Sequence, residues 1–397
     1  MAAMEKNNKN LNVPNLRFPE FSEEWEKCTL GDITRNFSLR NKDQIQYPMF
    51  SVTNSRGFVP QSEQFEDREM MGEDIKAYKI IHEGDFAYNP ARINVGSIAK
   101  YDNSEPCMIS SLYVCFKTIP QIDKEWLMQL LKTPKMNFYY NVNGEGGVRV
   151  YLFYPNFARI RTSYPSLAEQ QKISSFLSLL DQRIETQRKI IEDLKKLKDA
   201  ISNQNFTTGS ALKLGNVGKF IRGLTYSASD VIDDTIGTAV MRSNNISNGN
   251  PVNFEELVWV NKIPNYEQIL RGGDIVICMA NGSSPLVGKA SYYVDCGMES
   301  ATVGAFCGIY RSDNPLTKWL FQSKHYKKHI QRCIQGGNGA IANIYPEDIL
   351  AISFNIPSDY ERVLNILNSL EDKYLLEQKL LCRYLAVKSH LLAQMFI

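Results

Sequence analysis

Apolar residues recur at alternating intervals of four and three positions near the middle of the chain. The series is Ile173, Leu177, Leu180, Ile184, Ile191, Leu194 and Ile201, with Gln187 and Lys198 at two further positions of the same repeat. A seven-residue repeat with apolar a and d positions predicts an α-helix that packs lengthwise against another helix. Polar residues at two positions of this seam lower stability but help to fix the register of the helices.

The same pattern returns 190 positions later. The second seam is Val363, Leu367, Leu370, Tyr374, Leu381, Tyr384 and Leu391, and its polar members, Glu377 and Lys388, correspond to Gln187 and Lys198. Independent helices would have little reason to share these interruptions, so we interpret the two helices as copies. Each helix is either an ordinary amphipathic helix on its own domain or the partner of the other. A length of about 35 to 40 residues, roughly 55 to 60 Å, favours pairing, because a small domain cannot cover so long a seam.

Landmarks outside the helices also occur twice and in the same order. The pairs are Leu30-Gly31-Asp32-Ile33 and Leu214-Gly215-Asn216-Val217, Glu83-Gly84-Asp85-Phe86 and Gly272-Gly273-Asp274-Ile275, Val95-Gly96 and Val287-Gly288, Trp126-Leu127 and Trp319-Leu320, the glycine clusters starting at Gly144 and Gly336, Tyr154-Pro155 and Tyr345-Pro346, and Pro165-Ser166 and Pro357-Ser358. The aspartate turns predict strands at 86–88 and 275–279, the tryptophans mark helix starts, and each Pro-Ser pair is placed to begin and cap a long helix. The chain is therefore an internal tandem duplication of about 190 residues.

The duplication predicts four segments. These are a globular domain at 1–165, a long helix at 166–208, a second globular domain at 209–357 and a second long helix at 358–397. Residues 34–78 and 218–266 share little beyond strand-like alternation. One fold used twice is therefore expected to carry two different surfaces.

Composition is that of an ordinary globular protein, with 43% hydrophobic and 22% charged residues among 397. The polar start of the chain lacks the apolar core of a signal peptide, and no apolar run approaches the ~20 residues of a membrane span, so we expect a cytoplasmic protein. The eight cysteines form no C-x-x-C pair, which argues against a disulfide framework or a zinc knuckle. The net charge of +2 neither indicates nor excludes a nucleic-acid binder.

Two motifs and the doubled layout resemble the specificity subunit of a type I DNA restriction-modification enzyme. The motifs are Leu16-Arg17-Phe18-Pro19-Glu20-Phe21 with the following Leu30-Gly31-Asp32-Ile33, and the helix start Pro165-Ser166-Leu167-Ala168-Glu169-Gln170-Gln171-Lys172-Ile173. The resemblance covers nearly the whole chain. In one departure from it, the second helix begins Pro357-Ser358-Asp359-Tyr360-Glu361-Arg362-Val363, without the Glu-Gln-Gln-Lys-Ile of the first.

The resemblance implies an α+β fold in which two pseudo-symmetric target-recognition domains are separated by two long antiparallel helices forming a coiled coil. Each domain would read one half of a bipartite, gapped sequence in double-stranded DNA, and the helices would set the spacer and dock methyltransferase subunits. The implied partners are two copies of an adenine-specific methyltransferase subunit and often a restriction and translocase subunit. No cofactor is expected in this chain, because S-adenosylmethionine, ATP and Mg²⁺ would be bound by the partners.

Loops after the matched strands supply candidate DNA-contacting residues, because Arg, Asn and Ser side chains reach base edges and phosphates. In the first domain they are Thr53, Asn54, Arg56, Arg92, Asn94 and Arg149. In the second domain they are Arg242, Asn244, Asn245, Asn281, Ser283, Ser284 and Asn343. Asn and Arg are also common in plain turns. A basic run on a predicted helix is either a solvated face or a phosphate-binding face, and comprises Lys324, Lys327, Lys328 and Arg332.

Catalytic signals are weak. Tyr88-Asn89-Pro90-Ala91 resembles the Asn-Pro-Pro-aromatic motif of adenine methyltransferases, but Ala91 and Arg92 replace the proline and the stacking aromatic. His325 and His329 lack the glutamate of a zinc-binding H-E-x-x-H helix, and no phosphate-binding G-x-x-x-x-G-K-[ST] loop is present. We therefore expect neither a catalytic residue nor a metal site. The alternative to a DNA-binding subunit is a coiled-coil adaptor that joins protein partners.

Overall fold

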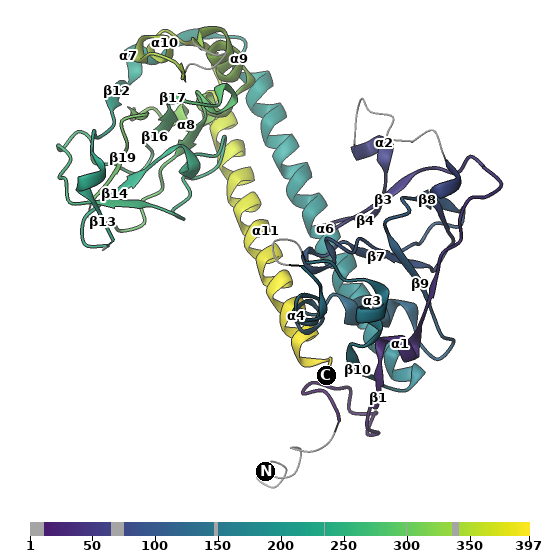
Figure 1. The fold of residues 1–397 in the computed structure, drawn as a ribbon. Coiled ribbons are helices and arrows are strands. Elements are labelled where there is room, and N and C mark those ends of the chain that lie inside the picture. The colour runs from purple at the N-terminus through teal and green to yellow at the C-terminus, as the bar shows by residue number, and fades with distance from the viewer. Residues whose placement is uncertain (1–11, 65–74, 147–149, 234, 299, 336–340) are drawn as a thin grey trace. The chain divides into compact units, whose positions relative to one another are not determined.

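The computed structural model describes residues 12–64, 75–146, 150–233, 235–298, 300–335 and 341–397. The chain divides into two compact units, of which the first comprises Met1–Arg188 with Lys379–Ile397 and the second Lys189–Gln378. Each unit therefore holds one globular domain and a segment of both long helices (Figure 1). The sequence analysis expected each long helix to be one segment, whereas here each helix is divided between the two compact units.

The first domain is built on a four-stranded antiparallel sheet. Its strand order is β2 (Thr34–Phe37), β9 (Val114–Thr118), β6 (Phe86–Tyr88) and β7 (Ile98–Lys100). Three antiparallel pairs accompany it, namely β1 (Glu26–Thr29) with β10 (Arg161–Tyr164), β3 (Phe50–Thr53) with β4 (Gly57–Pro60), and β5 (Lys79–Ile81) with β8 (Cys107–Ile109). The helices are α1 (Leu30–Ile33), α2 (Gln61–Gln64), α3 (Lys124–Leu131), α4 (Pro134–Asn143) and α5 (Tyr154–Ala158). The apolar faces of α1, α3, α4 and α5 share one core around Trp126, Phe116 and Phe157, each of which is fully buried.

The second domain repeats this plan. Its main sheet has the order β12 (Lys219–Arg222), β20 (Cys307–Arg311), β16 (Ile275–Cys278) and β18 (Ala290–Tyr292), and β11 (Ser210–Lys213) pairs with β22 (Ser353–Ile356). The corresponding helices are α7 (Leu214–Val217), α8 (Thr317–Gln322), α9 (Lys324–Cys333) and α10 (Pro346–Leu350). Because the main sheets have the same strand order and the same antiparallel pairing, the duplication inferred from the sequence is confirmed.

The two domains differ where their sequences diverge. The second domain has an additional four-stranded sheet of β13 (Val231–Ile232), β15 (Val258–Val260), β14 (Thr238–Met241) and β19 (Ala301–Val303), in which β14 and β19 run parallel. Its β17 (Ala280–Asn281) pairs with β21 (Ala342–Asn343). Among the described residues of the first domain, the strands in the corresponding part of the chain are those of the β3–β4 hairpin and the β5–β8 pair.

The repeated Gly-Asp turn shows how closely the backbone is copied. The Asp85 carboxylate accepts the His82 N–H at 3.0 Å, and the Asp274 carboxylate accepts the Arg271 N–H at 2.7 Å. A basic residue of the neighbouring strand pairs with each carboxylate, Lys117 at 3.5 Å and Arg311 at 2.7 Å. The same side-chain chemistry therefore anchors both turns to the central strand of the sheet.

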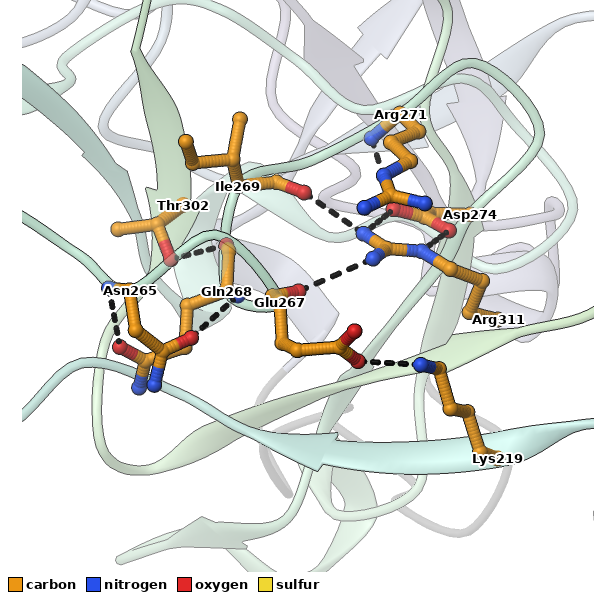
Figure 2. A network of polar contacts seen from close by, with 9 residues as sticks. All are labelled: Lys219, Asn265, Glu267, Gln268, Ile269, Arg271, Asp274, Thr302 and Arg311. Atoms are coloured by element: carbon orange, nitrogen blue, oxygen red, sulfur yellow. Dashed lines mark hydrogen bonds and ion pairs between the residues drawn. The ribbon is translucent and has the colours of Figure 1, made fainter.

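In the second domain the ion pair between Arg311 and Asp274 is part of a larger network of hydrogen bonds. Arg311 also donates to the carbonyl oxygens of Ile269 and Glu267, at 2.6 and 3.1 Å, as Figure 2 shows. Its hydrogen bonds to Asp274 raise the pKa of Arg311 above its usual value. The guanidinium thus ties the loop before the turn to the main sheet, in the part of the domain that diverges in sequence.

The long helices are α6 (Leu167–Asn205) and α11 (Tyr360–Gln394). Ser166 caps α6 as predicted, because its hydroxyl accepts the Glu169 N–H at 3.4 Å. The corresponding prediction for Ser358 is wrong. Pro357 and Tyr360 close a turn there, and the Asp359 carbonyl accepts the first helical N–H groups, from Arg362 at 3.0 Å and Val363 at 3.4 Å.

The predicted seam faces inward along both helices. Five of its apolar members are buried, namely Ile173, Leu177, Ile184, Val363 and Leu367. Six are half-buried, namely Leu180, Ile191, Leu194, Leu370, Leu381 and Leu391. Ile173 and Leu177 lie in the core of the first domain, and Val363 and Leu367 lie in that of the second. The first turns of each helix are therefore covered by a globular domain, so pairing between helices is not the whole explanation of the seam.

Farther along, the helices pair in antiparallel fashion through polar seam residues. In the second unit Lys198 of α6 pairs with Glu371 of α11 at 2.5 Å, and their side chains are 6% and 4% exposed. In the first unit Lys388 of α11 pairs with Asp181 of α6 at 2.5 Å. Each residue of one pair lies 190 positions from its counterpart in the other. The two ion pairs are thus copies related by the internal repeat.

Each acidic residue also binds its own domain. The Tyr292 hydroxyl of β18 donates to Glu371 at 2.5 Å, and the Gln129 amide of α3 donates to Asp181 at 3.0 Å. Burial, and next the hydrogen bond to Glu371, raise the pKa of the Tyr292 phenol above its usual range. One carboxylate in each unit therefore joins α6, α11 and a globular domain.

The difference in burial between the two ion pairs predicts a difference in their contribution to stability. Lys198→Met leaves the Glu371 carboxylate buried without its cation, and we expect a loss of about 3 kcal/mol in the free energy of unfolding. Lys388→Met is the matched control, with an expected loss below about 1 kcal/mol, because Asp181 is 38% exposed. Calorimetric unfolding of the full chain measures both. Adding Glu371→Gln to Lys198→Met should restore most of the loss, and equal losses in the two lysine variants would contradict this account.

Candidate nucleic-acid interface

The loop after β6 forms one wall of a groove in the first domain. This first groove is lined by Asn89, Pro90, Ala91, Arg92, Asn94, Val95, Leu112, Val150, Tyr151 and Phe153. The loop is ordered locally, because the Asn89 side chain accepts the Ala91 N–H at 3.0 Å and the Pro90 carbonyl accepts the Leu152 N–H at 3.0 Å. The Arg92 side chain is exposed. A guanidinium group is therefore held on a fixed loop, free to bind a ligand.

Apolar side chains surround this arginine. Leu112 is 78% exposed and Val95 is 54% exposed. The rings of Tyr151 and Phe153 stack with centroids 6.2 Å apart. The first groove thus combines a cation with an unusual amount of exposed apolar surface.

The other first-domain candidates lie apart from Arg92. Thr53, Asn54 and Arg56 line a separate hollow beside α6, and the Thr53 hydroxyl accepts the Arg56 N–H at 3.0 Å within the β3–β4 turn. Arg56 pairs with Glu63 at 3.3 Å on the surface. Asn94 belongs to the first groove, where its amide donates to Asn141 of α4 at 3.0 Å. Arg149 lies outside the described residues.

The second domain has a groove at the corresponding place. This second groove is lined by Tyr226, Arg242, Ser243, Ala280, Asn281, Gly282, Gly304, Ala305, Phe306, Cys307 and Ile341. The Asn281 amide donates to the Ser243 hydroxyl at 3.1 Å. Pairing of β17 with β21 places Asn343 beside Ala280, and the buried Asn343 Oδ1 accepts no hydrogen bond from a described residue. Candidates from three distant parts of the sequence therefore meet here.

Asn245 is not exposed to a ligand. It is fully buried, its amide donates to the carbonyls of Asn253 and Glu255, and its oxygen accepts the Arg242 N–H at 2.8 Å. The sequence expectation for Asn245 is wrong because this side chain is used to close the loop that presents Arg242. The remaining candidates Asn244, Ser283 and Ser284 are exposed outside the lining of the second groove.

The basic run occupies the exposed surface of α9. Lys324, Lys327, Lys328 and Arg332 are all exposed, and none forms a salt bridge with a described residue. His325 packs against Phe354 with centroids 5.1 Å apart, and the His329 ring contacts the Asp348 carbonyl at 3.1 Å. The corresponding helix α4 has a single basic residue, Lys135. Positive charge on this helix thus distinguishes the second domain from the first.

Within the described ranges, no three metal-ligating side chains come together, and no helix is long and apolar enough to cross a membrane. The grooves hold no arrangement of nucleophile and base either. What they offer is hydrogen-bond donors, cations and apolar contact.

The chain was compared with known protein families, curated proteins and solved structures. Residues 22–196 match the family model described as the type I restriction modification DNA specificity domain. Over 157 residues the chain is 31% identical to the type I restriction enzyme StySPI specificity subunit of Salmonella potsdam, and over 156 residues it is 31% identical to the EcoKI specificity subunit of Escherichia coli K12. Residues 22–196 of the chain, somewhat less than half of it, are thus similar to the DNA specificity domain of type I restriction-modification specificity subunits.

The two curated specificity subunits are matched over part of their length. Each match covers 36% of this chain and 32% of the relative. Solved structures extend the similarity of fold to nearly the whole chain. The type I restriction-modification S subunit from M. genitalium gives a TM-score of 0.56 at 13% identity, covering 97% of this chain and 99% of that one. A chain from a structural study of complex assembly in a type I R-M system gives a TM-score of 0.57 at 12% identity. That match covers 94% of this chain and 97% of the other.

The two motifs that resemble the specificity-subunit family contact each other. Arg17 donates to both carboxylate oxygens of Glu169, at 2.7 and 2.6 Å, and Glu169 is 1% exposed. Gln170 accepts the Asp123 N–H at 2.8 Å and donates to the Pro165 carbonyl at 2.9 Å. These residues clamp the start of α6 to the first domain. The segment Pro357-Ser358-Asp359 that precedes α11 lacks the corresponding Glu-Gln sequence.

The exposed apolar residues of the grooves could not be recognised from the sequence. Leu112, Tyr151 and Phe153 in the first groove, and Phe306 and Ile341 in the second, gave no signal, because apolar residues in strand-like stretches are expected in the core. Only their place in turns beside the candidate loops distinguishes them.

Proposed function

We propose that this chain is the DNA-binding specificity subunit of a type I restriction-modification enzyme, in which each domain reads one half of a bipartite, gapped target. The observation that carries the proposal is that one fold occurs twice, with a groove at the corresponding place lined by different side chains. The match of residues 22–196 to the type I restriction modification DNA specificity domain supports it. Different linings predict different half-sites.

The repeat suits a duplex target. Two copies of one domain carried on antiparallel, duplicated helices would be related by a pseudo-twofold axis, and they could then approach one face of B-DNA at places about one helical turn apart, roughly 34 to 36 Å. The paired helices then set the spacer between the half-sites. The ion pairs between the helices within each unit support this proposal, because they favour one register of the helices.

The groove residues suit two kinds of contact. Arg92 and Arg242 are exposed cations that can bind guanine or phosphate, and Asn281 can bind the edge of adenine. The four basic residues of α9 face no described acidic partner and suit phosphates, which carry affinity without sequence preference. Thr53, Asn54 and Arg56 form a second possible contact surface in the first domain.

The chemistry is assigned to partners. The chain would recruit two S-adenosylmethionine-dependent adenine methyltransferase subunits and often a restriction and translocase subunit that uses ATP and Mg²⁺. The outward faces of α6 and α11 are the docking surface that we propose, because Leu179 and Leu376 are 65% and 62% exposed there. The chain itself would perform no catalysis. A protein-only adaptor is not favoured, since it gives no reason for the match to a DNA specificity domain.

Salt dependence tests the DNA proposal and the role of α9 together. The logarithm of the affinity for a duplex should fall linearly with the logarithm of salt concentration, and Lys327→Gln with Lys328→Gln should reduce that slope by about 2. Lys213→Gln, which removes an exposed lysine of β11, is the control and should leave the slope unchanged. Fluorescence anisotropy at several salt concentrations measures it. Binding whose affinity does not depend on salt would contradict the DNA proposal. If the Lys327→Gln, Lys328→Gln variant has the same slope as the wild type, the basic face of α9 is a solvated surface that does not contact DNA.

Exchange of one domain tests the modular assignment. Residues 209–357 are replaced by the corresponding domain of another specificity subunit, and bound sequences are selected from a random duplex library. We expect one half-site to change, with the other half-site and the spacer retained, because the first groove and the helices are untouched. A change in both half-sites would refute the assignment of one domain to each.

A further inference from the structure

Each groove carries one exposed apolar side chain at the same place in the repeated fold. Leu112 lies in the turn between β8 and β9 and is 78% exposed. Phe306 lies in the turn between the corresponding strands β19 and β20 and is 64% exposed. Exposure of a large apolar side chain is unfavourable in water, and here it occurs twice at one position of the fold.

The backbone of each turn is held in place. The Phe306 carbonyl accepts the N–H groups of Met279 and Ala280, at 2.8 and 3.1 Å. In the first domain the Tyr113 N–H donates to the Ser110 carbonyl at 3.2 Å, and the Tyr113 hydroxyl accepts the Val52 N–H at 3.2 Å. Leu112 and Phe306 therefore project from ordered turns, as residues that contact a ligand do.

The surroundings of the two side chains indicate the ligand. Leu112 shares the first groove with Arg92 and Asn94, and Phe306 shares the second with Arg242 and Asn281. The major groove of DNA presents the matching mixture, since guanine and adenine offer hydrogen-bonding edges and thymine offers its C5-methyl group. Cations in the same grooves favour a polyanion over an apolar protein surface.

We propose that Leu112 and Phe306 are specificity-determining residues that each contact the C5-methyl group of a thymine, Leu112 in one half-site and Phe306 in the other. This inference rests on the proposed DNA-binding function and adds a contact to the two grooves. The difference between a leucine and a phenylalanine at equivalent positions agrees with half-sites of different sequence.

Thymine and deoxyuridine differ only by this methyl group, so they isolate the contact. Each thymine of the target, once defined by library selection, is replaced in turn by deoxyuridine, and the affinity of the full chain is measured at fixed salt. We expect about a fourfold loss at one position in each half-site, the value of one buried methyl group. Leu112→Ala should abolish the difference between thymine and deoxyuridine in the first half-site alone, and Phe306→Ala should do so in the second half-site alone.

Ile263→Ala is the control, because it truncates an aliphatic side chain that is 87% exposed and lines neither groove, and it should leave both ratios intact. The inference fails if wild-type protein binds thymine and deoxyuridine equally at every position, if a half-site contains no thymine, or if Leu112→Ala retains the full ratio. If Leu112→Ala keeps the ratio of affinities for thymine and deoxyuridine but loses binding to a methyltransferase subunit, the turn that carries Leu112 is a protein-docking surface instead. Absence of any sequence-specific binding by wild type would overturn the proposed function itself, and with it this inference.

Discussion

A lysine paired with an acidic residue of the opposite helix determines how each unit is held together. The pairs Lys198–Glu371 and Lys388–Asp181 are copies of one interaction, made twice by an antiparallel pair of duplicated helices. Such a pair is lost if one helix slips against the other by a turn, because the buried charge then has no partner. Glu371 and Asp181 also accept a hydrogen bond from Tyr292 and Gln129, so the register of the helices and the seating of the domains depend on the same carboxylates.

The two halves of the molecule share their scaffold and differ in their grooves. The main sheets, the Gly-Asp turns and the helix seams repeat in both halves, and they use side chains for anchoring. The grooves differ in almost every lining residue. A repeated scaffold with two different grooves is the arrangement expected of a protein that reads an asymmetric target, which is the function we propose.

Much of the fold could be predicted from the sequence because it is repeated. A periodic seam and an ordered set of matched turns are local signals, and they gave the long helices, the strands after Asp85 and Asp274, and the duplication itself. The partners of Lys198 and Lys388 could not be predicted, since Glu371 and Asp181 lie outside the apolar series and meet the lysines only once the register is known. The residues of the grooves were harder to predict for the same reason, because their exposure depends on contacts that only the fold reveals. Asn245 has the residue type of a base reader but is used to close a loop, whereas Leu112 and Phe306 have the residue type of a core and lie exposed.

The most direct test of the account is the methylation of genomic DNA in cells that express the methyltransferase partner, with and without this chain. Single-molecule sequencing detects modified adenine at each position. The account predicts a gapped, asymmetric motif whose two halves lose methylation together when the chain is removed. An unchanged pattern of methylated adenine, with both proteins present at normal levels before removal, would contradict it.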